Sequence, residues 1–232
     1  MISVIIPAYN EEGVVGRTIN QIRTNDVNKL VGEIIVVDGG SNDETVAESI
    51  AEGASVICGR KKGRACQMNE GAGNATGEIL YFVHADSIPP VGFSDLIFNA
   101  VKDGSVSGCF RLCFDFDHWF LKANAWFTRF DVNLFRFGDQ SLFVRKDAFH
   151  AEAGFREDHV VMEDQEIVTR LRRRGAFRII PAEIITSSRK YVANGVYKMQ
   201  AIFFLIFFMY RLGYPQEALV RTYRKLIAQD KV

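Results

Sequence analysis

Three acidic residues stand where a carboxylate is placed to meet a ligand. Asp38 and Asp86 each follow a short apolar run, and Asp164 opens a stretch with the periodicity of a helix. Carboxylates accept hydrogen bonds from ribose hydroxyls, hold Mg²⁺ or Mn²⁺, and take protons as general bases. The sequence therefore offers nucleotide binding, metal binding and proton transfer, provided that the fold brings the three residues together.

The apolar runs of the first hundred residues alternate with amphipathic stretches. Strands are predicted at 2–7, 33–38, 54–58 and 79–84, and helices at 11–23, 43–52 and 63–75. This alternation predicts an α/β fold with a mostly parallel sheet flanked by helices. Ligands of such sheets bind beyond the carboxyl ends of the strands. The polar segments at those ends are 7–11, 38–41 and 84–86.

The second half of the chain has a less regular pattern. Strands are predicted at 106–116, 141–145, 177–181 and 183–187, and helices at 162–174 and 197–228, the last broken near 213–215. Aromatic residues crowd the segment 119–137, where they either pack in the core, which we favour, or line a groove for a ligand. No repeat or flexible linker divides the chain, so a single domain over residues 1–232 is predicted.

The composition is that of a globular protein without a strong overall charge. Hydrophobic residues make up 48% of the chain, which excludes disorder, and 28 basic residues balance 28 acidic ones. No global basic field is available to attract nucleic acid. The four cysteines form no CxxC pair, and the first predicted strand begins at residue 2. We therefore expect reduced thiols and a cytoplasmic location.

Asp38 is followed by Gly39 and Gly40, which would let the backbone approach a ligand closely. A carboxylate at this place accepts hydrogen bonds from a ribose hydroxyl or a base, as in dinucleotide enzymes. The G-x-G-x-x-G turn of those enzymes is missing after the first strand, where Pro7 stands instead, so a Rossmann oxidoreductase is not expected. The alternative is that Asp38 only ends a strand and caps a turn.

The two other acids also allow two interpretations each. Asp86 near a diphosphate would hold Mg²⁺ or Mn²⁺ with few protein ligands, and His84 either adds a ligand or, as we favour, serves as a donor at the strand end. Asp164 would act as a general base, although on the residues alone Glu163 and Asp164 read as acids that a helix N-terminus favours. That N-terminus is expected to lower the pKa of Asp164.

Basic residues cluster at 60–64, just before a predicted helix, and Arg64 lies closest to its start. Helix N-termini bind anions, so Arg64 is a candidate for phosphate contact. The alternative is a solvated charged face.

Several motifs together resemble the family 2 glycosyltransferases of the GT-A fold. They are SVIIPAYNEE, VVDGGSNDET, FVHADS, and MED before a helix with RLRRRG, in the order of that family and spread over residues 2–189. The segments GRACQMNEGAG, FGDQSLFVRKDAF and SSRKY further resemble a bacterial subgroup of small, single-domain members. The resemblance implies transfer of a sugar from a nucleotide-sugar donor, with inversion at the anomeric carbon.

The resemblance also implies roles for single residues. Pro7, Tyr9 and Glu11 match the loop that embraces the nucleotide, and Asp38 matches an acid on its base or ribose. Asp86 matches the last acid of the D-x-D motif, which binds the divalent cation and the diphosphate. Asp164 matches the catalytic base.

Two arginines are candidates for further contact with the leaving diphosphate, whose charge needs counter-ions. They are Arg64, and Arg189 within the SSRKY segment.

The sequence departs from the family pattern at three places. His84 replaces the first acid of D-x-D, Gly39 replaces the second acid of V-D-D-G-S, and Q-x-x-R-W is reduced to residues 187–191. The first departure weakens the metal assignment, and the last argues against a processive polysaccharide synthase. The runner-up interpretations are a nucleotidyltransferase-like enzyme and a sugar-nucleotide-binding protein that has lost catalysis.

The expected division of labour follows the chain. Residues 1–100 would bind the UDP- or GDP-linked donor, 101–190 would shape the site of a lipid or sugar acceptor, and 191–232 would be helical. The apolar run 201–210 rises only about 15 Å as a helix, half of a bilayer core, so it does not span a membrane. We favour a helix buried against the domain, and the alternative is an interfacial helix flanked by Lys198 and Arg211, on the inner face of the membrane.

Overall fold

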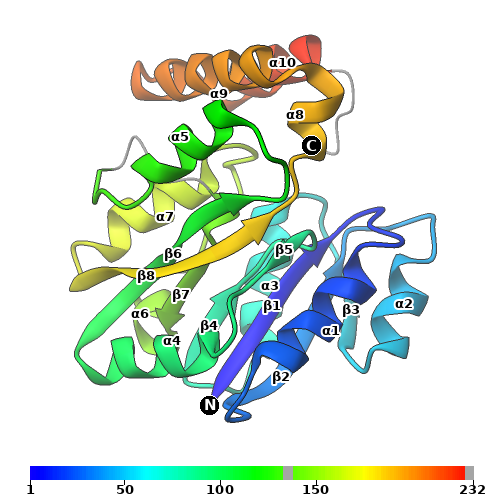
Figure 1. The fold of residues 1–232 in the computed structure, drawn as a ribbon, viewed down its shortest axis with the longest axis vertical. Helices are drawn as coiled ribbons and strands as arrows, with labels where there is room; N and C mark the ends of the chain where they lie inside the picture. Colours follow the sequence, from blue (N-terminus) through cyan, green and yellow to red (C-terminus); the bar gives the residue numbers. More distant parts are fainter. Residues whose placement is uncertain (133–137, 228–232) are drawn as a thin grey trace.

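An eight-stranded mixed sheet with helices on both faces organises the chain in a computed structural model, which describes residues 1–132 and 138–227 (Figure 1). The strands lie in the order β3-β2-β1-β4-β7-β6-β8-β5. They are β1 (Ile2–Ala8), β2 (Val31–Asp38), β3 (Ser55–Cys58), β4 (Ile79–Phe82), β5 (Ser87–Ile88), β6 (Ser105–Phe114), β7 (Leu142–Arg145) and β8 (Ala176–Thr186).

Helices connect and cover these strands. They are α1 (Val15–Asn25), α2 (Thr45–Ala51), α3 (Arg64–Asn74), α4 (Phe93–Lys102), α5 (Trp119–Phe127), α6 (Lys146–Ala151), α7 (Glu163–Leu171), α8 (Arg189–Asn194), α9 (Val196–Arg211) and α10 (Gln216–Leu226). The helices predicted in the first hundred residues are present with shifted ends, whereas α4, α5, α6 and α8 were not predicted.

The first four strands of the chain are parallel, because each is joined to the next by a crossover. Every residue of β1 is buried, as expected for a central strand covered on both faces. The register sets Ala8 beside Asp38, and Asp38 beside Cys58. The carboxyl ends of these strands therefore meet at one edge of the sheet.

The rest of the sheet is mixed: β6 and β8 run in the direction of the first four strands, and β7 and β5 run against them. β7 is antiparallel to β4 and β6, and β8 runs parallel to β6. The predicted strands 177–181 and 183–187 form one strand, β8. Its pairing with β6 continues across an irregularity between Ile180 and Glu183. Pro181 lies at that irregularity, where its missing N–H costs no ladder hydrogen bond.

Two apolar cores fill the two faces of the sheet. On one face α1 and α4 pack on the strands through residues such as Ile19 and Phe93. On the other face α3, α6 and α7 do so through residues such as Met68 and Leu171. The helix predicted at 162–174 is present as α7, and its apolar residues Ile167, Val168 and Leu171 are buried.

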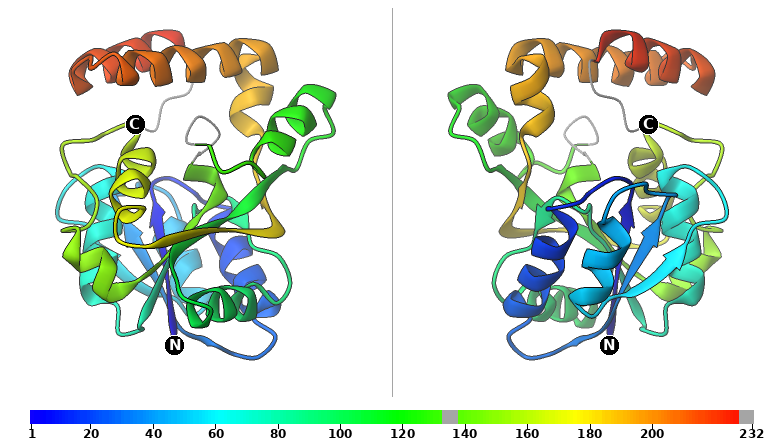
Figure 2. Two further views of the ribbon diagram at one scale, coloured as in Figure 1. Left: turned by 90° about the vertical axis from the view of Figure 1, so that its left-hand side faces the viewer. Right: turned by 90° about the vertical axis from the view of Figure 1, so that its right-hand side faces the viewer.

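A third core lies above the sheet, between α5, α8, α9 and α10 (Figure 2). The predicted break of the C-terminal helical segment is confirmed, since α9 ends at Arg211 and α10 begins at Gln216, with Gly213 in a left-handed conformation between them. The run 201–210 lies within α9 and is buried on one face only. Leu205, Phe208 and Leu212 on the other face are 43%, 56% and 76% exposed.

Among the described residues, no helix has the length and apolar character needed to cross a membrane.

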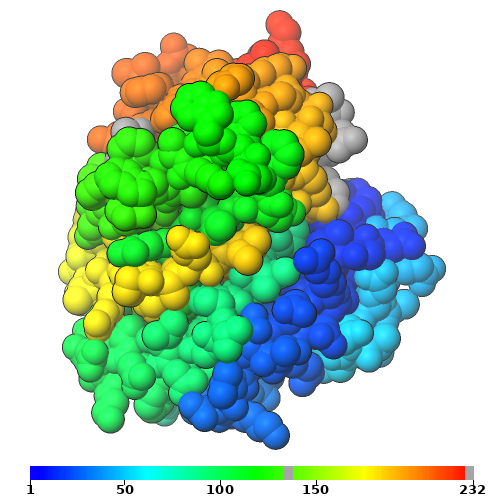
Figure 3. All heavy atoms as spheres, viewed as in Figure 1, coloured from blue at the N-terminus to red at the C-terminus, as the bar shows by residue number. Residues whose placement is uncertain are grey.

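The aromatic residues of 119–132 do not form core, contrary to the favoured interpretation. Trp119, Trp126, Phe127 and Phe130 are each at least 40% exposed. They lie on and just after α5, which forms one continuous surface with the C-terminal helices (Figure 3). Phe135 lies outside the described residues.

Candidate active site

A cavity of about 670 Å³ opens at the carboxyl ends of β1 and β4, beneath the C-terminal helices. Most of the predicted site residues line it: Pro7, Tyr9, Glu11, Arg64, Asp86, Asp164 and Arg189. Asp38 is buried and is not among the lining residues. The fold thus brings together residues that lie up to 182 positions apart in the sequence.

The loop after β1 is held in place by the segment that follows Asp38. The backbone N–H of Asn10 donates to Ser41 Oγ at 2.9 Å, and that of Glu11 donates to Thr45 Oγ1 at 2.7 Å. Asn10 takes a left-handed conformation, with φ of 50°. The polar motif after β2 therefore serves to fix the position of the first loop.

The carboxylate of Asp38 caps its own turn. It accepts hydrogen bonds from the backbone N–H groups of Gly40 and Ser41 and from Ser41 Oγ. The contact with a base or ribose stays a prediction.

Gln67, a lining residue that the sequence did not single out, ties the ends of β1 and β2 together. Its Nε2 donates to the carbonyl oxygens of Ala8 and Val37, both at 2.8 Å. A Cβ on Gly39 would lie 3.0 Å from that nitrogen. An acid at Gly39, as in the family pattern, would therefore require Gln67 to shift.

Arg189 joins the C-terminal segment to the sheet edge. Its Nη2 lies 2.7 Å from the carboxylate of Glu11 and 3.1 Å from Asp86 Oδ2. Burial raises the pKa of Asp86 against the opposing charges of His84 and Arg189. The arginine is positioned in turn by Ser188, whose N–H and Oγ both donate to Asp115 at the end of β6.

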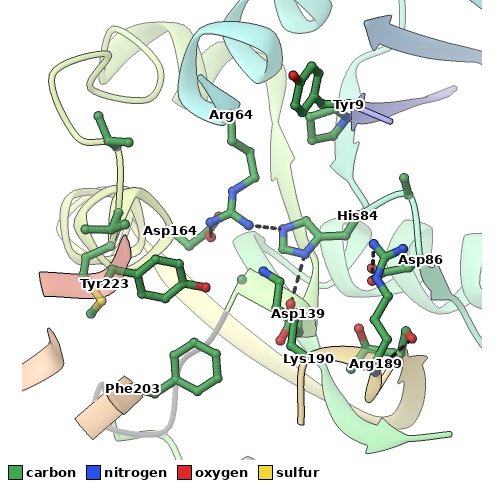
Figure 4. Close-up of a pocket in the computed structure, with 18 of the residues that line it drawn as sticks. Tyr9, Arg64, His84, Asp86, Asp139, Asp164, Arg189, Lys190, Phe203 and Tyr223 are labelled. Carbon is green, nitrogen blue, oxygen red and sulfur yellow. Dashed lines mark hydrogen bonds and ion pairs between the residues drawn. The ribbon is translucent and has the colours of Figure 1, made fainter. Parts of the chain in front are cut away.

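His84 lies at the centre of the cavity and bonds Asp139 (Figure 4). Its Nδ1 is 3.0 Å from Asp139 Oδ1, and its Nε2 is 3.5 Å from Arg64 Nη1. Burial acts to lower the pKa of His84, but the hydrogen bond with Asp139 and nearby carboxylate charges outweigh it and raise the pKa. Burial acts to raise the pKa of Asp139, and the bond and charge of His84 lower it to about 2.

Asp164 begins α7 beside a buried ion pair. Arg64 Nε binds the fully buried Glu163, and Arg64 Nη2 lies 3.9 Å from Asp164 Oδ2. Burial, and then the charge of Glu163, raise the pKa of Asp164 to about 6. The prediction that the helix N-terminus lowers this pKa is therefore wrong. A carboxylate that titrates near neutral pH is a stronger base than an ordinary aspartate.

Gly138 allows this arrangement because it has no side chain. Any Cβ at Gly138 would clash with Asp164 Oδ2, and it would also lie 3.2 Å from His84 Cε1. The turn that carries Asp139 therefore approaches both residues closely.

The donor set for a metal ion is small. Over the described residues no three His, Cys, Asp or Glu side chains are grouped to hold an ion. Asp86 lines the cavity, whereas Nδ1 of His84 is engaged by Asp139. This set fits an ion that arrives with a diphosphate and completes its shell with phosphate oxygens and water, as Mg²⁺ and Mn²⁺ do.

The basic cluster before α3 divides in two. Lys62 and Arg64 line the cavity, together with Gly63. Arg60 and Lys61 instead form ion pairs with Glu70 and Glu157 near the surface.

The wall opposite the sheet edge is mostly apolar and aromatic. It comes from β6, α8, α9 and α10, and its rings include Phe114, Tyr191, Phe203 and Tyr223. No local pattern indicates this wall, because an apolar helix such as α9 has the composition of core on every side. None of the described aromatic residues of 119–132 lines the cavity.

Comparison with known families identifies the sequence. The profile of the family described as "Glycosyl transferase family 2" matches residues 3–160. Glucosyl-3-phosphoglycerate synthases from Mycolicibacterium smegmatis and Mycobacterium tuberculosis are each 36% identical over 97 residues. These matches cover 38% of this chain, and 32% and 30% of those proteins. The chain thus matches about a third of the length of these curated relatives.

Solved structures share the fold over most of the chain. TarS of S. aureus superposes with a TM-score of 0.67 at 15% identity, over 97% of this chain and 42% of TarS. The mannosyltransferase PcManGT from Pyrobaculum calidifontis, in complex with GDP-Man and Mn²⁺, gives 0.66 at 20% identity, over 88% and 61% of the two chains.

The M. tuberculosis glucosyl-3-phosphoglycerate synthase, in complex with Mn²⁺, UDP and glucosyl-3-phosphoglycerate, gives a TM-score of 0.57 at 20% identity, over 79% and 70% of the two chains. At these identities the likeness concerns the fold, which is GT-A.

Proposed function

The chain belongs to glycosyl transferase family 2, and from that premise we propose that it transfers a sugar from a nucleotide-diphosphate donor to an acceptor hydroxyl, with inversion. The observation that carries the proposal is a single cavity lined by the β1 loop, the end of β4, the start of α3 and the start of α7. It supplies a base, cations for a leaving diphosphate and a carboxylate for a divalent ion.

The reaction asks for one in-line displacement. The acceptor oxygen attacks the anomeric carbon, the bond to the diphosphate oxygen breaks, and the hydroxyl proton passes to Asp164. Its pKa of about 6 leaves Asp164 ionised at neutral pH and still basic enough to assist. Arg64 and Arg189, both lining the cavity, would neutralise the leaving nucleoside diphosphate.

The donor is proposed to be UDP- or GDP-linked, held by Pro7, Tyr9 and Glu11 in the half formed by residues 1–100. Related structures hold UDP with Mn²⁺, or GDP-Man with Mn²⁺. By analogy we propose that Asp86 of this chain binds a divalent cation, Mn²⁺ or Mg²⁺. Bound there with the donor, it would add positive charge at the diphosphate.

Thermal stabilisation by nucleoside diphosphates, with and without Mn²⁺, tests the donor site. Ligand binding at 100 times Kd should add about 2.7 kcal/mol to the free energy of unfolding. We expect a metal-dependent shift with UDP or GDP that Asp86→Ala removes. Exposed Asp103→Ala is the matched control and should keep it. No shift with any nucleotide would overturn the proposal. A shift that does not depend on metal would favour a sugar-nucleotide-binding protein that has lost catalysis.

The outer face of α9 supports the interfacial interpretation of 201–210, and we extend the proposal to contact with an anionic membrane surface. The exposed residues Leu205, Phe208 and Leu212 share that face, and Tyr197 joins it to Trp119 through ring contact at 6.4 Å. Residues 196–226 hold five Lys and Arg and one acidic residue. An apolar stripe with basic flanks fits acidic lipid headgroups at the inner face of a membrane.

Cosedimentation with vesicles tests this surface. The protein should bind vesicles of mixed phosphatidylcholine and phosphatidylglycerol more tightly than pure phosphatidylcholine. Phe208→Glu should reduce binding, whereas Val91→Glu, at an exposed site remote from α9, should not. Equal recovery of Phe208→Glu and the unaltered protein on acidic vesicles would contradict the proposal.

A further inference from the structure

Phe203 and Tyr223 of the aromatic wall lie on the side of the cavity away from Tyr9 and Asp86, where the donor is proposed to bind (Figure 4). We propose that this wall binds the acceptor, and that the acceptor is an amphipathic alcohol: one hydroxyl on an apolar ring or hydrocarbon body. This inference rests on the proposed function, since it concerns the second substrate of the same site.

The wall is a continuous row of rings from four elements. Phe114 of β6 contacts Tyr191 of α8 edge-on, with centroids 5.2 Å apart. Tyr191 contacts Phe203 of α9 at 5.8 Å, and Phe203 contacts Tyr223 of α10 at 6.4 Å. All four line the cavity, and Leu112 extends the apolar surface.

Two of the rings retain surface that a core residue would have buried. Phe114 and Phe203 are only partly buried against the third core, although they lie between the sheet and the C-terminal helices. Ile206, one turn after Phe203, is 3% exposed and also faces the cavity. Part of the Phe114 and Phe203 rings is therefore available to an apolar ligand, whereas Tyr191 and Tyr223 are only 8% and 6% exposed.

Three polar side chains beside the rings form hydrogen bonds with one another. Tyr191 Oη bonds Gln200 Oε1 at 3.2 Å, and Asn124 Nδ2 bonds the same oxygen at 3.1 Å. A charged group packed on the rings would lose hydrogen bonds to water that the rings do not replace, whereas an apolar body loses none.

The cations of the cavity lie mostly toward the carboxylates. Arg64 and Arg189 are ion-paired with Glu163, Glu11 and Asp86, and the charge of Lys190 lowers the pKa of Asp139. Lys190 and Arg224 also line the cavity, next in sequence to Tyr191 and Tyr223, so these two positions of the row carry charge. Phe114 and Phe203, in contrast, have no charged sequence neighbour among the lining residues.

The position of the wall sets the geometry of attack. In Figure 4 Phe203 and Tyr223 enter the cavity from the side of Asp164, and Tyr9 and Asp86 lie at the opposite side. An acceptor whose apolar body rests on these rings presents its hydroxyl to Asp164, between the wall and the donor site. The apolar wall and the polar donor site lie on different sides of Asp164 (Figure 4), so the acceptor and the donor would lie on different sides of the base.

An acceptor panel tests the inference. With the nucleotide sugar whose nucleotide stabilises the protein, we expect glycosylated products from benzyl alcohol, geraniol and n-octanol, detected by mass spectrometry. Their kcat/KM should be at least tenfold above those of glycerol and 3-phosphoglycerate. Preference for glycerol or 3-phosphoglycerate, or no preference, would overturn the inference. Nucleotide stabilisation that persists in that case would leave the donor proposal standing, and its absence would remove both.

A matched pair of phenylalanine variants tests the wall itself. Phe203→Gln should raise KM for the apolar alcohols at least fivefold and leave nucleotide stabilisation unchanged. Phe98→Gln, at an exposed position of α4 that does not line the cavity, should change neither. If Phe203→Gln does not fold, Phe203→Trp, which keeps the ring and fills the cavity, should raise KM in its place. An unchanged acceptor KM in the folded Phe203 variant would contradict the proposal.

Discussion

The two walls of the cavity are built in opposite ways. The wall at the sheet edge consists of short loops whose backbone N–H groups donate to side chains, as that of Glu11 does to Thr45 Oγ1, and whose charges are paired, as Arg189 is with Asp86. The wall from α8, α9 and α10 consists of packed rings, of which Phe203 is only partly buried. The polar wall suits the nucleoside diphosphate of a donor, and the apolar wall suits an acceptor with an apolar body.

The largest expected effect removes the base that lies between the walls. Asp164→Asn should lower kcat by about 10²- to 10⁴-fold, the usual contribution of general base catalysis, and leave nucleotide binding intact. The exposed Asp117→Asn serves as control. Steady-state rates and thermal shifts with nucleotide separate the two effects. A change of less than threefold in kcat would assign proton transfer to another group.

Arg189→Met removes the cation that pairs with Glu11 and Asp86 in the polar wall. Two carboxylates, Glu11 and Asp86, would then face each other without their shared cation. We expect about tenfold weaker nucleotide binding, moderated because Arg189 is partly exposed to solvent. Arg189→Lys should restore part of the affinity, because it keeps the charge without the planar fork. Calorimetric titration measures both. Full affinity in the Met variant would show that this wall does not need the cation.

The raised pKa of Asp164 predicts a dependence on pH for both activity and stability. The value of kcat/KM should fall as pH drops through about 6, because the base becomes protonated. The folded state binds this proton more tightly than the unfolded chain, so stability should be lost as pH rises from about 4 to about 6. Asp164→Asn should melt higher than the unaltered protein at pH 8, and this advantage should shrink as pH falls and vanish below about pH 4. A constant difference at all pH values would contradict the assigned shift.

The smallest expected effect concerns Asp38, beneath the polar wall. Asp38→Asn should lose about 1 kcal/mol of stability, since an amide nitrogen cannot accept the N–H groups of Gly40 and Ser41. Denaturant titration measures the loss. Unchanged nucleotide affinity would mean that Asp38 only caps the turn, and a weaker affinity would assign it to the base or ribose.

The sequence predicts the two walls unequally. The strands before Asp38 and Asp86 are apolar runs with polar ends, so local pattern alone places those residues at the sheet edge. Arg189 required the resemblance, because nothing local shows that it pairs with Glu11. The aromatic wall could not be predicted at all, since only the packing of α8, α9 and α10 decides that Tyr191 is buried while part of Phe203 stays open.

Prediction failed where tertiary contacts oppose a local rule. A helix N-terminus lowers the pKa of an acid in water, but burial and the neighbouring Glu163 reverse the sign at Asp164. The aromatic residues on α5 were expected in the core, and they are exposed because the third core is filled by α9 and α10 instead. In both cases the outcome depends on burial, which is decided by segments that are distant in the sequence.

In the proposed reaction the base near the apolar wall directs an acceptor hydroxyl at the anomeric carbon of a donor held by the polar wall. Identifying both products of a single reaction tests this most directly, with mass spectrometry for the masses and NMR for the anomeric configuration. We expect a nucleoside diphosphate and a glycoside whose configuration is opposite to that of the donor. A glycoside of retained configuration, or an acceptor carrying a nucleoside monophosphate, would contradict it.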